Sequence, residues 1–411
     1  TAGSWAKINN AARLYHNNSA TTYGAEWDAG QIAMVAFDAD AGKIWYGVNG
    51  TWDASGNPAT AANPSQSSVT GTDFFFATTS GSGTLTYVAN FGQDSSFAGN
   101  TTAQGNQDGN SIGDFFYAPP SGFLALCTKN LPDVAVTPSE HFNTVLWTGN
   151  GSSQSISSLE FQPDFTWIKS RSIVDSHHLF DSVRGAGQRL RSDSTAAENY
   201  NETAYLTSFD SDGFSLGGDD GVNKNTATYV AWNWKANGSG SSNTDGDVTS
   251  TVSANVDAGF SIVTYTGTGS NINVGHGLSK APEIVIVKVR NETGGWYANV
   301  KNIPSQSAGT DMVAVLNDTA ALNGMNVGQW YFGSQAPTSS VFRVQNKDDV
   351  GENGDTHVAY CFHSVDGYSS IGTYTGNGNA DGTFVYTGFR VKWLLVRRTD
   401  GGSADWLIFD A

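Results

Sequence analysis

The residues best suited to chemistry in this sequence are tryptophans beside amide and carboxylate side chains. Trp27, Asn49, Trp52 and Asp53 surround a tight turn near the N-terminus. A flat indole can stack on the C–H face of a sugar ring, while amide and carboxylate groups hydrogen-bond its hydroxyls. Trp45 lies in a strand-like run, and by alternation it points inward. We interpret the four loop residues as a candidate glycan-binding site, with a purely structural role as the alternative.

A second group has the residue types of nucleophilic catalysis. It comprises Ser176, His177, His178 and Asp181. A nucleophile, a base and an acid must converge on one point. A strand directs alternate side chains to opposite faces, and no Gly-x-Ser-x-Gly elbow accompanies these residues. We predict a strand lined by His178 and Phe180, with Asp181 paired to Arg184 near its end. The sequence predicts no catalytic residue and a chain that is not an enzyme.

Acidic side chains are the remaining candidates for ligand chemistry. They are Asp210, Asp212, Asp219 and Asp220. Two or three carboxylates with backbone carbonyls suffice for weak Ca²⁺ binding, and solvated turns are the alternative. The seven histidines show no zinc-ligand spacing. We therefore predict no cofactor, apart from surface Ca²⁺ at this acidic group.

The overall charge excludes one class of partner. The chain has 21 Lys and Arg against 38 Asp and Glu, which gives a net charge of −17 and a pI near 4.6. Such a chain repels a phosphate backbone, so nucleic acid is not expected as a partner. There is no apolar stretch of about 18 residues and no charged-then-apolar leader, so the sequence shows neither a membrane span nor a secretory signal.

The composition predicts an all-β chain. Only 14% of residues are charged, and 48 are glycine. Together with abundant Asn, Ser and Thr, this suits short strands joined by many turns, and almost nothing reads as helix. The pattern is common in extracellular and virion-surface β proteins. Cys127 and Cys361 fall in different apolar runs, so we predict two buried thiols and no disulfide.

Three copies of one repeat fill the C-terminal two thirds of the chain. The first block of the repeat reads Trp147–Gly151, Tyr265–Gly269 and Tyr374–Gly378. The second block reads Pro163–Lys169, Pro282–Lys288 and Val391–Arg397. A third block, Thr228–Lys235, recurs as Thr356–His363 and is not reached in the third copy. Self-similarity on this scale indicates a modular array rather than one catalytic body.

The repeat divides the chain into tandem β-sandwich (jelly-roll-like) modules. We predict a first β-sandwich at 1–136, a first repeat module at 137–237, a Gly/Ser/Asn/Asp linker at 238–250, a second module at 251–365 and a partial third at 366–411. The linker is nearly free of apolar residues, which favours a flexible joint and modules strung like beads. Because the third copy stops half-way and Thr1 is not methionine, we expect the chain to be a piece of a longer protein.

The first domain resembles the SPRY (B30.2-like) β-sandwich family. The resemblance rests on the order of Asp38-x-Asp40-x-Gly42-Lys43-Ile-Trp45, Asn49-Gly50, Gly56-x-Pro58, Asn90-Phe91-Gly92 and Pro120-x-Gly122-Phe123. Independently of the resemblance, apolar runs around turn residues predict a hairpin over 31–48 and strands at 73–77, 85–91 and 122–127. The strands expected before Trp27 are poorly marked, so this domain is expected to be incomplete at its N-terminus.

The repeats resemble modules of marine bacteriophage tail-fibre and appendage proteins. This resemblance implies a virion structural protein at the particle surface or outside the cell. Its implied partners are other virion proteins, a host-surface glycan or receptor, and further copies of itself, in a trimer as in many fibres. A bacterial cell-surface or filament adhesion protein is the alternative. A polysaccharide depolymerase is a third reading, which would need a groove holding two carboxylates about 5 to 9 Å apart.

Overall fold

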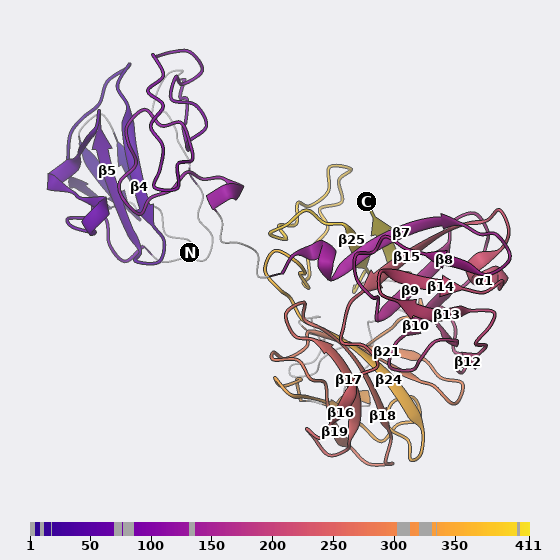
Figure 1. Ribbon diagram of the computed structural model, residues 1–411. Helices are drawn as coiled ribbons and strands as arrows, with labels where there is room; N and C mark the ends of the chain where they lie inside the picture. Colours follow the sequence, from indigo (N-terminus) through magenta and orange to yellow (C-terminus); the bar gives the residue numbers. More distant parts are fainter. Residues whose placement is uncertain are drawn as a thin grey trace. The chain divides into compact units, whose positions relative to one another are not determined.

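The computed structural model divides the chain into two compact units, Thr1–Asp133 and Val134–Ala411 (Figure 1). The boundary lies three residues before the predicted one. The described residues are 5–8, 12–17, 19–69, 76, 86–130, 136–301, 313–319, 331–333, 335–400 and 403–411. Antiparallel strands dominate both units, which confirms the prediction of an all-β, sandwich-type fold. No helix among the described residues is long and apolar enough to cross a membrane.

Two small antiparallel sheets organise the described residues of the first unit. One contains β1 (Trp5–Ile8), β2 (Arg13–His16) and β3 (Ser19–Thr22), and the other contains β4 (Ala33–Asp38), β5 (Lys43–Val48) and β6 (Thr51–Trp52). The predicted hairpin is confirmed, since β4 and β5 pair from Asp38 with Lys43 onward. Between β5 and β6, Asn49 and Gly50 both have positive φ, as a type I′ turn requires. Trp45 is buried, and its indole N–H donates to the carbonyl of Ala62.

Two predicted strands of the first unit are absent. Residues 86–91 and 122–127 form no strand, and of the predicted strand at 73–77 only residue 76 is described. Local side chains take the backbone hydrogen bonds instead: the Asn90 side chain accepts from Gly92 and Gln93, and the Asp108 carboxylate accepts from Ala125. Such side-chain bonds compete with a strand ladder. Cys127 is consequently exposed rather than buried, whereas Cys361 is buried as predicted.

Repeat one (137–237) forms a six-stranded and a three-stranded sheet. The strand orders are β12-β11-β10-β9-β15-β7 and β13-β14-β8. The elements are β7 (Phe142–Thr148), β8 (Gln154–Ile156), β9 (Phe165–Ser170), β10 (His177–Asp181), β11 (Gln188–Arg191), β12 (Asn199–Tyr200), β13 (Leu206–Asp210), β14 (Gly213–Leu216), the single helical turn α1 (Asp220–Asn223) and β15 (Thr228–Trp234).

Repeat two, predicted at 251–365, has the same plan, although its first strands begin at Ser241, within the predicted linker. Its large sheet has the order β16-β17-β18-β24-β20-β21-β22, and its small sheet pairs β19 with β23. The elements are β16 (Ser241–Asn243), β17 (Ser250–Asn255), β18 (Phe260–Thr266), β19 (Ile272–Gly275), β20 (Ile284–Val289), β21 (Trp296–Val300), β22 (Val313–Val315), β23 (Val341–Val344) and β24 (Thr356–Phe362).

In the described residues of repeat three (366–411), β25 (Trp393–Val396) and β26 (Leu407–Asp410) form a hairpin. Its register repeats that of β9 and β10. Trp393 faces Asp410 as Phe165 faces Asp181 in repeat one, so the sequence repeat is also a structural one.

The central strands of each large sheet are buried on both faces, which explains their uninterrupted apolar runs. In β15, Tyr229 and Ala231 point into the sandwich of repeat one, whereas Val230, Trp232 and Trp234 point away from it. The latter three belong to a second cluster that also takes side chains from repeat two, and the hairpin of repeat three packs against it. A continuous apolar run is the signature of a strand with two buried faces.

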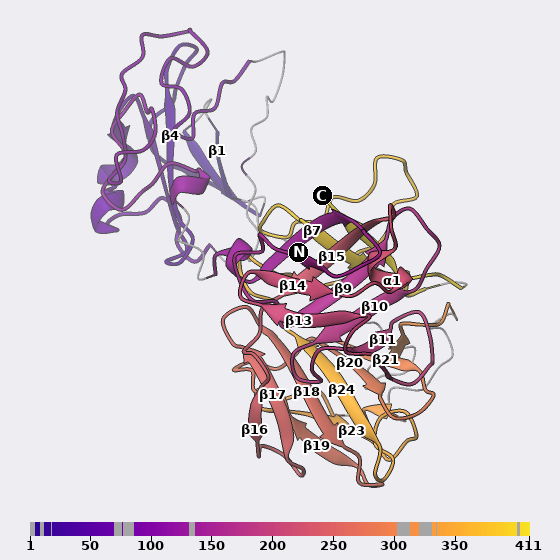
Figure 2. The same ribbon diagram turned by 45° about the vertical axis from the view of Figure 1, so that its right-hand side comes forward.

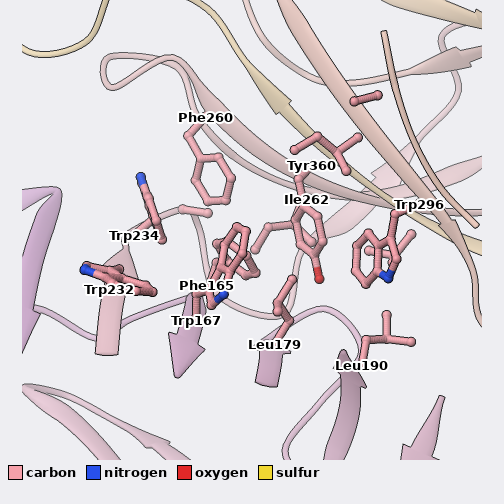
Figure 3. Close-up of a cluster of buried hydrophobic side chains, with 14 of the residues drawn as sticks. Phe165, Trp167, Leu179, Leu190, Trp232, Trp234, Phe260, Ile262, Trp296 and Tyr360 are labelled. Carbon is pink, nitrogen blue, oxygen red and sulfur yellow. The ribbon is translucent and has the colours of Figure 1, made fainter. Parts of the chain in front are cut away.

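That shared cluster corrects the expectation of modules strung like beads. Figure 3 shows Tyr360 and Phe260 of repeat two turned toward Phe165 of repeat one, with ring centroids at 4.4 and 6.0 Å from it. Figure 2 shows the large sheets of the two repeats side by side. The predicted linker is also ordered: residues 241–243 form β16, which pairs with β17, and the amide of Asn237 donates to Ser253 Oγ. Apolar faces on both repeats hold them together.

Candidate functional site

The predicted glycan site lies in the first unit, and several of its residues already have partners within the chain. Asp53 is buried. Its carboxylate accepts hydrogen bonds from the Lys7 ammonium and, at 3.0 Å, from the Ala25 amide. Lys7 also lies over the Trp27 ring, 5.1 Å from its centroid, in a cation–π arrangement. The structure thus brings Trp27 and Asp53 together through Lys7.

The other two predicted residues lie on the β5–β6 hairpin. Asn49 is exposed, and its side-chain oxygen accepts from the Ile32 amide at 2.9 Å. Trp52 is half-buried and pairs with Gly47 in β5. Because Asp53 is occupied by Lys7, the groups that could meet a sugar here are the half-exposed rings of Trp27 and Trp52 and the amide of Asn49.

The four acidic residues predicted as weak calcium ligands are used individually. Asp210 accepts from the hydroxyls of Ser208 and Ser215. Asp219 caps α1 by accepting from the Gly221 amide and also pairs with Arg189, and Asp220 pairs with Lys224. The backbone carbonyl of Asp212 accepts a hydrogen bond from the Leu159 amide. These four side chains therefore form no common ligand set among the described residues.

A different acidic group does converge. Carboxylate oxygens of Glu292, Glu352 and Asp355 lie within 4.8 Å of one another. The pKa of Glu292 is raised, first by partial burial and second by the negative charge of the nearby Asp355. Three carboxylates at this spacing could hold a divalent cation. Sequence reasoning missed the group because its members come from two turns about 60 residues apart.

The histidine-rich strand β10 does not assemble a catalytic relay. The Nδ1 atom of His177 accepts a hydrogen bond from the Trp167 indole at 2.9 Å, while His178 points to the opposite face. Burial lowers the pKa of each ring to about 4. In the described part of the chain, no hydrogen bond joins Asp181 to either imidazole; its carboxylate instead accepts a 2.6 Å hydrogen bond from Arg184 Nε, as the sequence predicted.

Asp181 and Arg184 belong to a buried polar network that joins repeats one and two. Besides Asp181, Arg184 donates to Glu198 at 2.7 Å and to the hydroxyl of Tyr360 at 3.3 Å. Burial by itself would lower the pKa of this guanidinium, but its acidic neighbours, Asp181 foremost, outweigh burial and raise it. Arg290 of repeat two donates to the same Glu198. A fully bonded buried network of this kind fixes one arrangement of the sheets that supply it.

Comparison with known proteins identifies the larger unit. A family described as a domain of unknown function (DUF7483) matches residues 137–411. The chain belongs to this family. The DUF7483 region coincides with the three repeats and, within three residues of its start, with the second compact unit. No curated protein and no solved structure matches the chain.

Proposed function

We propose that the chain is a non-enzymatic structural protein of a bacteriophage virion appendage, such as a tail fibre or spike, that adheres to a host surface or its glycans. In this proposal the protein works at the virion surface beside other virion proteins and further copies of itself. The acidic, turn-rich β composition supports an exposed location. The DUF7483 region serves as the rigid body, and the first unit, which we propose to be SPRY-like, contacts the host surface.

The observation that carries the proposal is the shared cluster between the repeats. Among the described residues, sixteen buried side chains from repeats one and two form it, including Trp167, Trp234, Trp296 and Tyr360. Burial on this scale makes the two sandwiches one rigid object, since apolar surface returned to water costs about 25 cal/mol per Å². A stiff body suits an appendage that must hold a binding surface away from a particle.

The use of the titratable side chains also favours binding over catalysis. The buried Asp164 accepts from the backbone amides of Ala236 and Gly238, and Asp181 is bonded to Arg184. Carboxylates committed to structural hydrogen bonds are not available as an acid and base pair. The half-exposed rings of Trp27 and Trp52 are better suited to holding a sugar.

The proposal is tested with the full chain and a panel of purified bacterial surface polysaccharides. Binding is measured by titration, and the length of each polysaccharide by size-exclusion chromatography after incubation. We expect saturable binding without shortening. Trp27→Ala and Trp52→Ala should each weaken binding about tenfold, as loss of one stacking ring does, whereas Tyr87→Ala is the control because Tyr87 is an exposed ring elsewhere in the unit.

The other outcomes decide against parts of the proposal. Shortened polysaccharide would replace adhesion by depolymerase activity. Binding that is retained in both tryptophan variants would move the contact out of the predicted site. No binding to any glycan would leave a structural role without adhesion, and detection of the chain on bacterial filaments instead of particles would favour the cell-surface alternative.

A further inference from the structure

Repeat three presents an apolar face whose counterparts in the other repeats are covered. Leu407 and Phe409 are 51% and 54% exposed. By the matched hairpin register they correspond to His178 and Phe180 of repeat one, which are 2% and 0% exposed. Phe180 is covered because it packs inside the sandwich that the small sheet completes.

The edge of β25 is the second part of this face. In repeat one, β9 lies between β10 and β15, and in repeat two the equivalent β20 lies between β21 and β24. Their equivalent β25 pairs only with β26 among the described residues. An open strand edge next to exposed apolar side chains is a template for another strand.

The turn before the hairpin is also open in repeat three, whereas the equivalent turns of repeats one and two are covered. A methyl group on Gly149 would overlap the carbonyl oxygen of Lys224, and one on Gly267 would overlap that of Glu352. These carbonyls belong to the segments just before β15 and β24. Gly376 takes the same place in repeat three, and a methyl group there would meet nothing within 4 Å.

The opposite side of the hairpin is already docked as in a complete repeat. Trp232 of repeat one donates its indole N–H to Asp410 at 3.1 Å. Tyr360, which holds the same place in repeat two, donates to Asp181 at 2.7 Å. Since Asp410 and Asp181 are equivalent, repeat three packs on repeat one as repeat one packs on repeat two.

We infer that the hairpin of repeat three is a docking site for a polypeptide segment with the pattern of a repeat's second half, as in residues 206–234 of repeat one. A strand like β15 or β24 joins the edge of β25, and the residues before it cover Leu407, Phe409 and Gly376. The pattern shared by β15 and β24 is Thr, a ring, Val, Ala, a ring, one variable residue and a ring, so the bound segment presents alternate rings to the shared cluster.

The test appends residues 183–236 after Ala411, where Ala411 takes the place of Ser182. The full chain and the extended chain are compared by hydrogen exchange at residues 393–396 and by binding of a hydrophobic dye. We expect exchange at these amides to slow at least about tenfold in the extended chain and dye binding to fall. An extension with residues 228–234 in scrambled order is the control and should change neither readout.

Gly376→Ala supplies a second readout with an internal control. It should have no effect in the 411-residue chain, and it should reduce the added protection in the extended chain, because the methyl group then meets the docked segment. Unchanged exchange and dye binding in the extended chain would overturn the inference, as would protection that ignores Gly376→Ala. Protection of β25 in the 411-residue chain, with a mass above one chain, would overturn it in favour of a second copy on this face.

Discussion

The hydroxyl of Tyr360 donates a 2.7 Å hydrogen bond to Oδ2 of Asp181, 179 residues earlier in the chain. Both side chains are fully buried. Burial raises the pKa of Tyr360 well above its usual value, so the hydroxyl keeps its proton. The bond joins β24 of repeat two to β10 of repeat one.

Removal of this bond should destabilise the DUF7483 region. Tyr360→Phe leaves Asp181 paired with Arg184, so we expect a loss of about 1 to 2 kcal/mol. Asp181→Asn removes the main counter-charge of a buried guanidinium, so we expect a loss of about 3 kcal/mol or more. Urea denaturation measures both. Asp220→Asn breaks an exposed pair with Lys224 and serves as the control, with a loss below about 0.5 kcal/mol. Equal effects of Asp181→Asn and Asp220→Asn would contradict this account.

Stability should fall in mild acid because of buried histidines. Burial lowers the pKa of His357 to about 4. The unfolded chain takes up a proton near the ordinary value of about 6.5, which the folded ring resists, so stability is full above that value and is lost as the pH falls toward 4. The two values correspond to at most about 3 kcal/mol for this ring.

His357→Phe should therefore flatten the acid limb of the stability curve. The ring stacks on Tyr265 with centroids 4.9 Å apart, as Tyr229 stacks on Trp147 in repeat one, so phenylalanine keeps the contact without the titrating group. The measurement is urea denaturation from pH 4 to 7. Parallel curves for the variant and the parent chain would show that His357 does not contribute, although His177 and His178 would still titrate.

Three equivalent glycines should respond differently to alanine. Gly149→Ala and Gly267→Ala each force a methyl group against a backbone carbonyl, so we expect losses of about 1 to 3 kcal/mol. Gly376→Ala has open space around it and should change stability by less than about 0.5 kcal/mol. Thermal melting compares the three. A large loss at Gly376 would show that its surroundings are already filled.

The two thiols should differ sharply in reactivity. Cys127 is exposed, whereas Cys361 is buried and burial raises its pKa to about 12. Since the thiolate is the reactive form, the native chain should take up one equivalent of a thiol reagent, at Cys127, and two after unfolding. Cys127→Ser should abolish the native reaction. Rapid labelling of Cys361 in the folded chain would place β24 outside the core.

Local patterns predicted the elements and the nearby contacts. The second repeat block forms β9, β20 and β25 in matched positions. Asp181 and Arg184 pair because they lie three residues apart at the end of β10. The β4–β5 hairpin likewise follows from apolar runs around an Asp/Gly turn. Each of these signals lies within a few residues of sequence.

The packing of the repeats on one another could not be predicted in the same way. A run such as that of β15 indicates two buried faces, but it does not say what covers the second face. The contact of Tyr360 with Asp181 depends on how two sheets stack, and the group of Glu292, Glu352 and Asp355 depends on how two turns meet. Such long-range contacts produce no recognisable spacing of residues in the sequence. In the first unit, Asn90 and Asp108 turned predicted strands into loops through side-chain bonds.

The central claim is that repeats one and two form a single cooperative body. It is tested most directly by hydrogen exchange on the full chain at increasing urea, followed separately for β7 of repeat one and β18 of repeat two. The account predicts one shared midpoint for the two strands, and a common shift of that midpoint in Asp181→Asn. Two separate midpoints, with only repeat one responding to the substitution, would contradict it.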